Sequence, residues 1–205
     1  IKDVGFMVCN TDAQALDNSP VEEKVQLGRE GLGAGNDPEN GRKAAIESLD
    51  DIRRRLEAAG TRMLFVTAGM GGGTGTGAAP VVAEIARDMG ILTIAVVTKP
   101  FAFEGKTRMR KAESGIDELK QRVDTLVVIP NERLLQVCPK GTSFKGAFNF
   151  ADDVLRQGIQ GISDLISQTG IINLDFADVT AIMKDAGLAH MGVGRAAGKG
   201  KAEEA

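Results

Sequence analysis

The sequence predicts an α/β protein built on a doubly wound, mostly parallel sheet, and two observations support this fold class. Short β-rich runs alternate along the chain with longer stretches in which apolar residues recur at helical spacing. Three of these runs, residues 63–68, 91–98 and 125–129, are almost uniformly apolar, as parallel strands are when crossover helices bury both faces. A chain of 205 residues is long enough for one such domain, or for a domain with a piece of another.

The expected elements follow in a regular order. A strand at residues 6–10 comes first, and the next elements are a helix at 41–59, a strand at 63–68, a helix at 78–89, a strand at 91–98, a helix at 112–123 and a strand at 125–129. A long helix at residues 147–167 would then span about 30 Å. A turn and a short helix at residues 176–187 follow it. Sheets of this kind bind ligands at the carboxyl ends of their strands.

The composition excludes several classes of protein. A net charge of −3 gives no reason to expect nucleic acid or an anionic membrane as a partner. The two cysteines, Cys9 and Cys138, lie in different segments without metal-ligand spacing, which indicates reduced thiols. No apolar run is long enough to insert in a membrane, and the first residues lack the pattern of a signal peptide. We therefore expect a cytoplasmic protein.

The most unusual segment is GMGGGTGTG, residues 69–77, which has six glycines between an expected strand and an expected helix. Bare backbone N–H groups at such a turn, beside the positive end of a helix dipole, form a site for an anion such as phosphate. The alternative is a tight turn without a ligand, for which one or two glycines would be enough. Six glycines with two interleaved threonines favour the phosphate site.

Two common phosphate motifs do not fit this segment well. A Walker P-loop requires a lysine that Gly75-Thr76-Gly77 lacks. A dinucleotide fingerprint can be fitted to Gly73, Gly75 and Ala78, but the next strand does not end in the acidic residue that would hold a ribose hydroxyl. A dinucleotide-dependent oxidoreductase is thus a less favoured alternative.

Residues 69–105 resemble the nucleotide-binding core of the tubulin/FtsZ family of GTPases, in its bacterial cell-division branch. Four more segments resemble the family in the same order, namely NTDAQAL, GLGAG, ADDVLRQGIQGISDLI and NLDFADV. The resemblance implies a GTP-binding α/β domain at residues 1–146, a central helix at 147–169, a catalytic loop and helix at 170–187, and the start of a second domain at 188–205.

The resemblance also implies a bound nucleotide, GTP or GDP, accompanied by Mg²⁺ for which no protein ligand is assigned. The backbone of the glycine-rich segment would cradle the phosphates, through Gly71, Gly72, Gly73, Thr74, Gly75, Thr76 and Gly77. Glu104 and Arg108 resemble the pair that contacts the ribose and phosphate region, although the residues alone fit an exposed pair at a helix start equally well.

Asn131 and Asp152 match the positions at which the family reads the guanine edge. A carboxylate can accept hydrogen bonds from N1–H and from the 2-amino group of guanine, a donor pair that adenine lacks. Phe148, one helical turn before Asp152, resembles the aromatic residue that packs on the base. Ordinary core packing is the alternative for Phe148.

Asp175 and Asp178 have the spacing of a helix N-cap and a first-turn acid, and the residues alone favour that structural role. The resemblance instead assigns Asn173, Asp175 and Asp178 to a loop that enters the nucleotide pocket of the next subunit and orients the attacking water. Hydrolysis would then require head-to-tail association of identical subunits, an open contact that produces filaments. The lone His190 has no neighbouring acid or nucleophile, and we assign it no role.

The chain also departs from the family pattern. The family has a further strand and phosphate loop ahead of the strand at 6–10, and the segment at 26–35 is a few residues short. If the polypeptide began at Ile1, we would expect weak GTP binding, and a form that binds nucleotide or a partner without assembling is the alternative function. The tail that recruits other division-ring proteins to the division site is not in this sequence.

Overall fold

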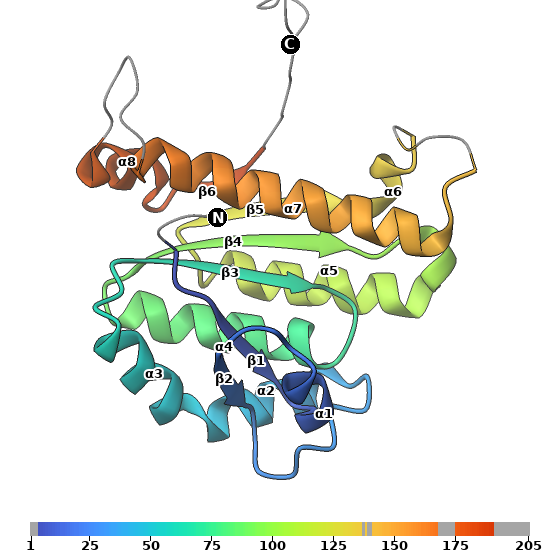
Figure 1. Ribbon diagram of the computed structural model, residues 1–205, viewed down its shortest axis with the longest axis horizontal. Helices are drawn as coiled ribbons and strands as arrows, with labels where there is room; N and C mark the ends of the chain where they lie inside the picture. The colour runs from blue at the N-terminus through green and yellow to red at the C-terminus, as the bar shows by residue number, and fades with distance from the viewer. Residues whose placement is uncertain (1–3, 137, 139–140, 168–174, 191–205) are drawn as a thin grey trace, which may run out of the picture.

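The computed structural model describes residues 4–136, 138, 141–167 and 175–190, and its main feature is a parallel sheet with helices on both faces (Figure 1). The strand order is β3-β4-β5-β6, and the strands are β3 (Met63–Gly69), β4 (Leu92–Lys99), β5 (Thr125–Pro130) and β6 (Gly187–Ala189). Helices α4 (Thr74–Asp88) and α5 (Lys106–Lys120) cover one face, while α7 (Phe144–Ser167) covers the other. The predicted fold class, a doubly wound parallel α/β sheet, is confirmed.

A second, two-stranded parallel sheet lies beside α4 and consists of β1 (Met7–Asn10) and β2 (Glu23–Gln26). In the described residues this pair does not share hydrogen bonds with the larger sheet, so the strand expected at 6–10 exists but belongs to a separate sheet. The sequence analysis did not predict β2, β6 or the one-turn helix α1 (Ala13–Asp17). Each of these elements is too short for its sequence to show a regular recurrence of apolar residues.

The burial of the three apolar runs is uneven. β4 is buried along almost its whole length and β5 along most of it, as predicted. In β3, however, only Val66 is buried, and Thr67 and Gly69 are exposed. The strand does have cover on both faces, since Leu64 and Ala68 pack against the core with α4 and α5 while Met63 and Phe65 pack against the core with α7. Its burial is only partial, however, and β3 is the edge strand of the described four-stranded sheet.

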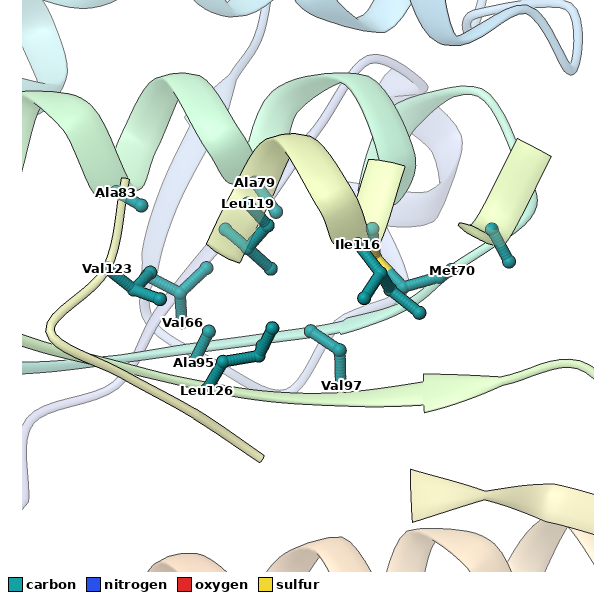
Figure 2. Packing of buried hydrophobic residues seen from close by; sticks show 11 residues of the cluster. Val66, Met70, Ala79, Ala83, Ala95, Val97, Ile116, Leu119, Val123 and Leu126 are labelled. Carbon is teal, nitrogen blue, oxygen red and sulfur yellow. The ribbon is translucent and has the colours of Figure 1, made fainter. Parts of the chain in front are cut away.

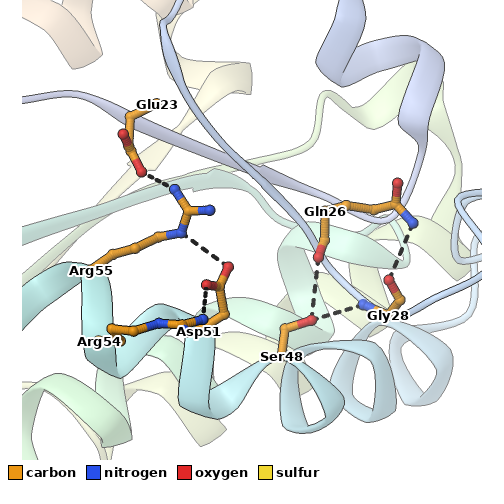
Figure 3. A network of polar contacts seen from close by, with 7 residues as sticks. All are labelled: Glu23, Gln26, Gly28, Ser48, Asp51, Arg54 and Arg55. Atoms are coloured by element: carbon orange, nitrogen blue, oxygen red, sulfur yellow. Dashed lines mark hydrogen bonds and ion pairs between the residues drawn. The ribbon is translucent and has the colours of Figure 1, made fainter.

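The single helix expected at residues 41–59 is two helices, α2 (Pro38–Glu47) and α3 (Leu49–Ala58), which meet at Ser48. The Ser48 hydroxyl accepts a hydrogen bond from the N–H of Gly28 at 2.9 Å and donates one to the carbonyl of Gln26 at 3.3 Å (Figure 3). At Ser48 the backbone departs from the helical conformation, with φ −102° and ψ 9°, and the hydroxyl joins this break to the end of β2. Figure 3 also shows Arg55 of α3 bridging Asp51 and Glu23, which ties α3 to β2.

Three other helices begin earlier than the periodicity predicts, whereas α8 (Phe176–Met183) begins as predicted but ends before residue 187, where β6 begins. α4 begins at Thr74 rather than at residue 78, α5 at Lys106 rather than at 112, and α7 at Phe144 rather than at 147. Three short elements complete the list, namely the 3-10 turn η1 (Ala102–Glu104), α6 (Asn131–Leu134) and α8 (Phe176–Met183). No helix in the described ranges is both long and apolar enough to cross a membrane.

Alternate residues of the strands face two separate cores. On one face Ala95, Val97 and Leu126 pack with side chains of α4 and α5, as Figure 2 shows. On the other face Ile94 and Val96 pack with Ile159 of α7 and with its neighbours. The two cores fix the positions of all the loops at the carboxyl ends of β3, β4 and β5.

The thiol of Cys9 on β1 provides a test of the smaller sheet. Burial raises the pKa of Cys9 from an ordinary 9.0 to about 11, and Arg55 opposes this shift only in part. Since the folded state holds the proton more tightly than the unfolded state, this contribution to stability is present below pH 9 and is lost as the pH rises towards 11. We expect urea midpoints measured between pH 8 and pH 10.5 to fall more steeply for the parent protein than for Cys9→Ala. If the urea midpoints of the two proteins fell equally with pH, the raised pKa of Cys9 would be contradicted.

Candidate functional site

The unusual loops of the sequence lie at one edge of the larger sheet, as predicted for a parallel sheet. The glycine-rich segment follows β3, the turn η1 lies between β4 and α5, and α6 follows β5 (Figure 1). The loops of the smaller sheet reach the same place, because the Thr11 and Thr74 hydroxyls share a hydrogen bond of 2.6 Å. The carboxyl edge is thus where the candidate binding residues gather.

The turn after β3 is held closed by its own helix. Gly71 has a φ of +105°, a conformation that L side chains rarely adopt. Its N–H donates a buried hydrogen bond of 2.7 Å to the hydroxyl of Thr76, which is only 2% exposed. The Thr76 side chain therefore shapes the turn from inside, a role that the sequence analysis did not foresee.

Packing explains several of the glycines without any ligand. A Cβ on Gly73 would lie 2.7 Å from the Cβ of Ala34, one on Gly75 would lie 2.8 Å from the carbonyl oxygen of Gly69, and one on Gly77 would lie 1.9 Å from that of Pro38. Gly72 differs, since its Cβ would meet nothing nearer than the guanidinium of Arg108 at 4.0 Å. Glycine content alone is thus weaker evidence for a phosphate site than the sequence suggests, and Gly72 has space for a ligand.

The structure brings Arg108 to the glycine turn. A Cβ on Gly71 would lie 2.7 Å from the Arg108 carbonyl oxygen and from its Cγ, so the start of α5 packs directly on the turn. Arg108 is paired with Glu104 at 3.0 Å and its side chain remains 44% exposed. Glu104 also accepts a hydrogen bond of 2.8 Å from the Phe101 N–H. Glu104 therefore has a structural role in η1, whereas Arg108 is a cation available at the turn.

A second cation, Lys111, was missed by the sequence analysis. Its ammonium donates a 2.5 Å hydrogen bond to the carbonyl of Asn36, a residue with a φ of +58°. Lys111 follows Arg108 by three residues on α5. This i, i+3 spacing on one helix face could have indicated a second basic group at the edge.

Asn131 begins α6 at the end of β5 and is only 4% exposed. Its side-chain oxygen is buried and has no hydrogen-bond partner in the part of the chain that the structure describes. Buried polar atoms are almost always paired, so an acceptor left free in a candidate site is a place for a ligand donor. The position fits the predicted contact with a base.

Phe148 belongs to a cluster of four phenylalanines. Its ring meets Phe101 edge to face at 5.1 Å between centroids, and Phe103 and Phe144 complete the cluster. Phe101 is fully buried, whereas Phe148 is still 41% exposed. Phe148 therefore packs on the protein and keeps an open surface. Asp152, one turn further along α7, is exposed and has no hydrogen-bonding or ionic partner among the described residues.

Asp175 and Asp178 form a reciprocal capping box at the start of α8. One oxygen of Asp175 accepts the Asp178 N–H at 2.9 Å, and one oxygen of Asp178 accepts the Asp175 N–H at 3.2 Å. Both residues are exposed. α8 lies at the far end of α7 from the glycine turn, so one chain does not bring these carboxylates to the glycine-rich edge (Figure 1). Asn173 lies outside the described residues.

These features define a class of protein, namely a parallel α/β domain with a glycine-rich strand-to-helix turn at the edge where such sheets bind nucleotides. Residues 2–139 match the model of the Tubulin/FtsZ family, GTPase domain. The chain belongs to this family of GTPases.

Solved structures agree with this assignment. An empty FtsZ dimer from M. jannaschii is 48% identical, with a TM-score of 0.90 over 96% of this chain and 57% of that one. CetZ2 from Haloferax volcanii, in a GTPγS-bound protofilament, shares the fold at 24% identity, with a TM-score of 0.73 over 88% of this chain and 53% of that one. The chain thus spans little more than half of the length of these archaeal proteins.

Proposed function

We propose that this chain binds GTP at the carboxyl edge of its sheet and hydrolyses it in a site shared by two subunits. The observation that supports GTP most directly is the buried, partnerless side-chain oxygen of Asn131, at the same edge as the glycine turn, in a member of a GTPase family. The oxygen can accept a hydrogen bond from a base, and the exposed carboxylate of Asp152 can accept from N1–H and the 2-amino group of guanine.

The residues present fit a nucleoside triphosphate. The turn from Gly71 to Gly73 and the first turn of α4, at Thr74 to Gly77, would provide backbone N–H groups and the helix dipole for the phosphates. Arg108 would add a cation, and the open face of Phe148 would pack on the base. Mg²⁺ would neutralise phosphate charge in the bound state. The described residues contain no group of three or more acidic, histidine or cysteine ligands, so we assign the ion no protein ligand.

The catalytic half would come from another copy of the chain. Asp175 and Asp178 each use one carboxylate oxygen in the capping box and leave the other free towards solvent. Two acidic groups with free oxygens can orient a water for attack on a γ-phosphate. With Asn173, they would act on nucleotide bound at the glycine turn of the neighbouring subunit. Repetition of this contact produces an open head-to-tail filament.

The broader role follows as part of the same proposal. A filament-forming GTPase of this family would act in the cytoplasm at the division site, with itself as the first partner and with further division-ring proteins bound through segments outside this sequence. A chain that binds nucleotide without turnover is the second candidate, supported by the position of α8, which one chain does not bring to the glycine-rich edge (Figure 1). A dinucleotide-dependent oxidoreductase is disfavoured, because the chain belongs to a family of GTPases.

Phosphate release measured against protein concentration tests the proposal, with GTP, ATP and NADH supplied separately. Because the site needs two chains, we expect turnover per molecule to rise with concentration, with GTP alone. A rate per molecule that does not depend on concentration would refute the shared site. GTP binding without any turnover would favour the second candidate.

A further inference from the structure

Helix α8, which bears the two carboxylates, is held by the buried Val179, by Phe176 and Met183 packed on the core under α7, and by polar contacts. At its carboxyl end the Thr125 hydroxyl donates to the carbonyl of Met183 at 2.5 Å, and Arg87 pairs with Asp185 at 2.8 Å. A cavity of about 240 Å³ lies between the helix and the amino end of β4. Because this side of the helix is not filled by close packing, the contacts at its two ends contribute to its exact position.

The contact at the other end of α8 is made by Arg62. The guanidinium carbon of Arg62 lies 4.3 Å from the centroid of the Phe176 ring, within the range of a cation–π interaction. Phe176 is the first residue of α8 and lies between Asp175 and Asp178 in the sequence, and it also packs against the core under α7. The cation therefore touches the end of the helix from which both carboxylates extend.

Arg62 is itself well placed to hold a fixed position. Its carbonyl accepts the N–H of Leu92 at 3.1 Å, so its backbone is anchored to the start of β4. In the described part of the chain its side chain has no carboxylate partner, which leaves the Phe176 ring as its contact. A guanidinium stacks flat on a ring and is more weakly hydrated than an ammonium, which suits it to this arrangement.

We propose that Arg62 is a positioning residue for the shared GTPase site, holding the capping box of α8 through Phe176 at the place where the next subunit needs it. The proposal rests on the function proposed above, in which Asp175 and Asp178 act on the neighbouring nucleotide. Small displacements of a catalytic group lower the rate strongly, so a contact remote from the nucleotide can control turnover without touching it.

The test compares Arg62→Met, Arg62→Lys and the control Arg54→Met, which removes an exposed arginine of α3 that pairs with Asp51. At saturating protein and GTP, we expect Arg62→Met to lower kcat about fivefold, the effect of losing one partly exposed cation–π contact. Arg62→Lys should have an activity between those of the parent and Arg62→Met, because it keeps the charge but loses the flat guanidinium stack. KM for GTP should stay unchanged in all three, because the nucleotide half of each chain is untouched. A parental kcat for Arg62→Met would overturn the proposal.

Two further measurements separate the possible failures. Phe176→Leu should lower kcat as Arg62→Met does, and the double variant should be no slower than either single one; additive losses would show that the two side chains are not coupled. Asp178→Asn serves as the reference. If it retains full turnover, the shared site itself is wrong. If it loses turnover while Arg62→Met does not, only the positioning role of Arg62 is wrong.

A mixing experiment asks where Arg62 acts. Arg62→Met chains keep an intact glycine turn, and Asp152→Ala chains keep an intact α8. Mixing the two is expected to raise turnover per Arg62→Met chain, whereas adding Asp178→Asn chains is expected to leave it low. A merely structural defect would not be relieved by a partner. The absence of rescue by Asp152→Ala chains would therefore contradict the proposal.

Discussion

Replacing Asp178 by asparagine is expected to lower GTP turnover at least about a hundredfold, the usual scale of a group that positions or activates a reacting water. The asparagine side-chain oxygen can still accept the Asp175 N–H, so the capping box survives and folding stability should stay near that of the parent. GTP affinity should also be retained, since α8, to which the residue belongs, lies near the end of α7 that is remote from the glycine turn (Figure 1). Steady-state phosphate release, urea unfolding and nucleotide titration measure the three quantities.

Asp178→Ala and Asp50→Asn are the matched controls. The alanine removes the charge and the acceptor of the Asp175 N–H, while Asp175 still caps the helix, so it should cost about 0.5–1 kcal/mol in the free energy of unfolding, with the same loss of turnover. Asp50 is another exposed first-turn acid, on α3, and its change to asparagine should leave turnover unaffected. If Asp178→Asn instead abolished GTP binding, the residue would belong to the pocket of its own chain.

The capping box also shows why the sequence alone left this pair undecided. An N-cap residue and an acid three residues later have the same spacing whether they cap the start of a helix or present two carboxylates to a ligand. In the structure the pair does cap α8, so the structural role is met, but each residue keeps one oxygen free. The two roles are therefore compatible in one pair of residues.

The sequence predicted those parts of the fold whose signals are long. β4 and β5 are continuous apolar runs, and α7 repeats its apolar residues over many turns, so both the type and the approximate limits were predictable. The break at Ser48 was not, because no glycine or proline marks it and the partner of its side chain, Gly28, is remote in the sequence. The partial exposure of β3 was not predictable either, since strand order decides which runs lie at an edge.

The candidate site was predictable as a location but not as a set of contacts. Parallel strands place their carboxyl ends together, so the glycine segment, Glu104 and Asn131 could be assigned to one edge in advance. The closure of the turn by Thr76 and the partnerless oxygen of Asn131 depend on neighbours that only the folded chain supplies. The reason for each glycine was the least predictable feature, because close packing and phosphate binding both require glycine.

Substitution of alanine for Gly77 is expected to lower the free energy of unfolding by about 2–3 kcal/mol, the cost of forcing a methyl group into a filled space. The new Cβ would lie 1.9 Å from the Pro38 carbonyl oxygen and 2.6 Å from the Arg42 backbone nitrogen, so α2 and α4 must separate. Gly161→Ala, in α7, is the matched control: its Cβ meets nothing within 4 Å, and the better helix propensity should stabilise the protein by about 0.5–1 kcal/mol. Urea unfolding of the nucleotide-free protein measures both.

If glycine-to-alanine substitution lowers the free energy of unfolding at Gly77 and raises it at Gly161, packing requires the glycine at position 77 before any nucleotide binds.

Gly72→Ala then tests the requirement for glycine in nucleotide binding, because a Cβ there has open space apart from Arg108. We expect it to leave the free energy of unfolding within about 0.5 kcal/mol of the parent value and to weaken GTP binding by crowding the phosphates. If Gly72→Ala bound GTP normally, the backbone of the turn would not be the cradle. If Gly77→Ala were as stable as the parent, the close approach of α2 to α4 would not be what demands a glycine there. The segment GMGGGTGTG would thus divide into a part that seats α4 on α2 and a part that faces the nucleotide.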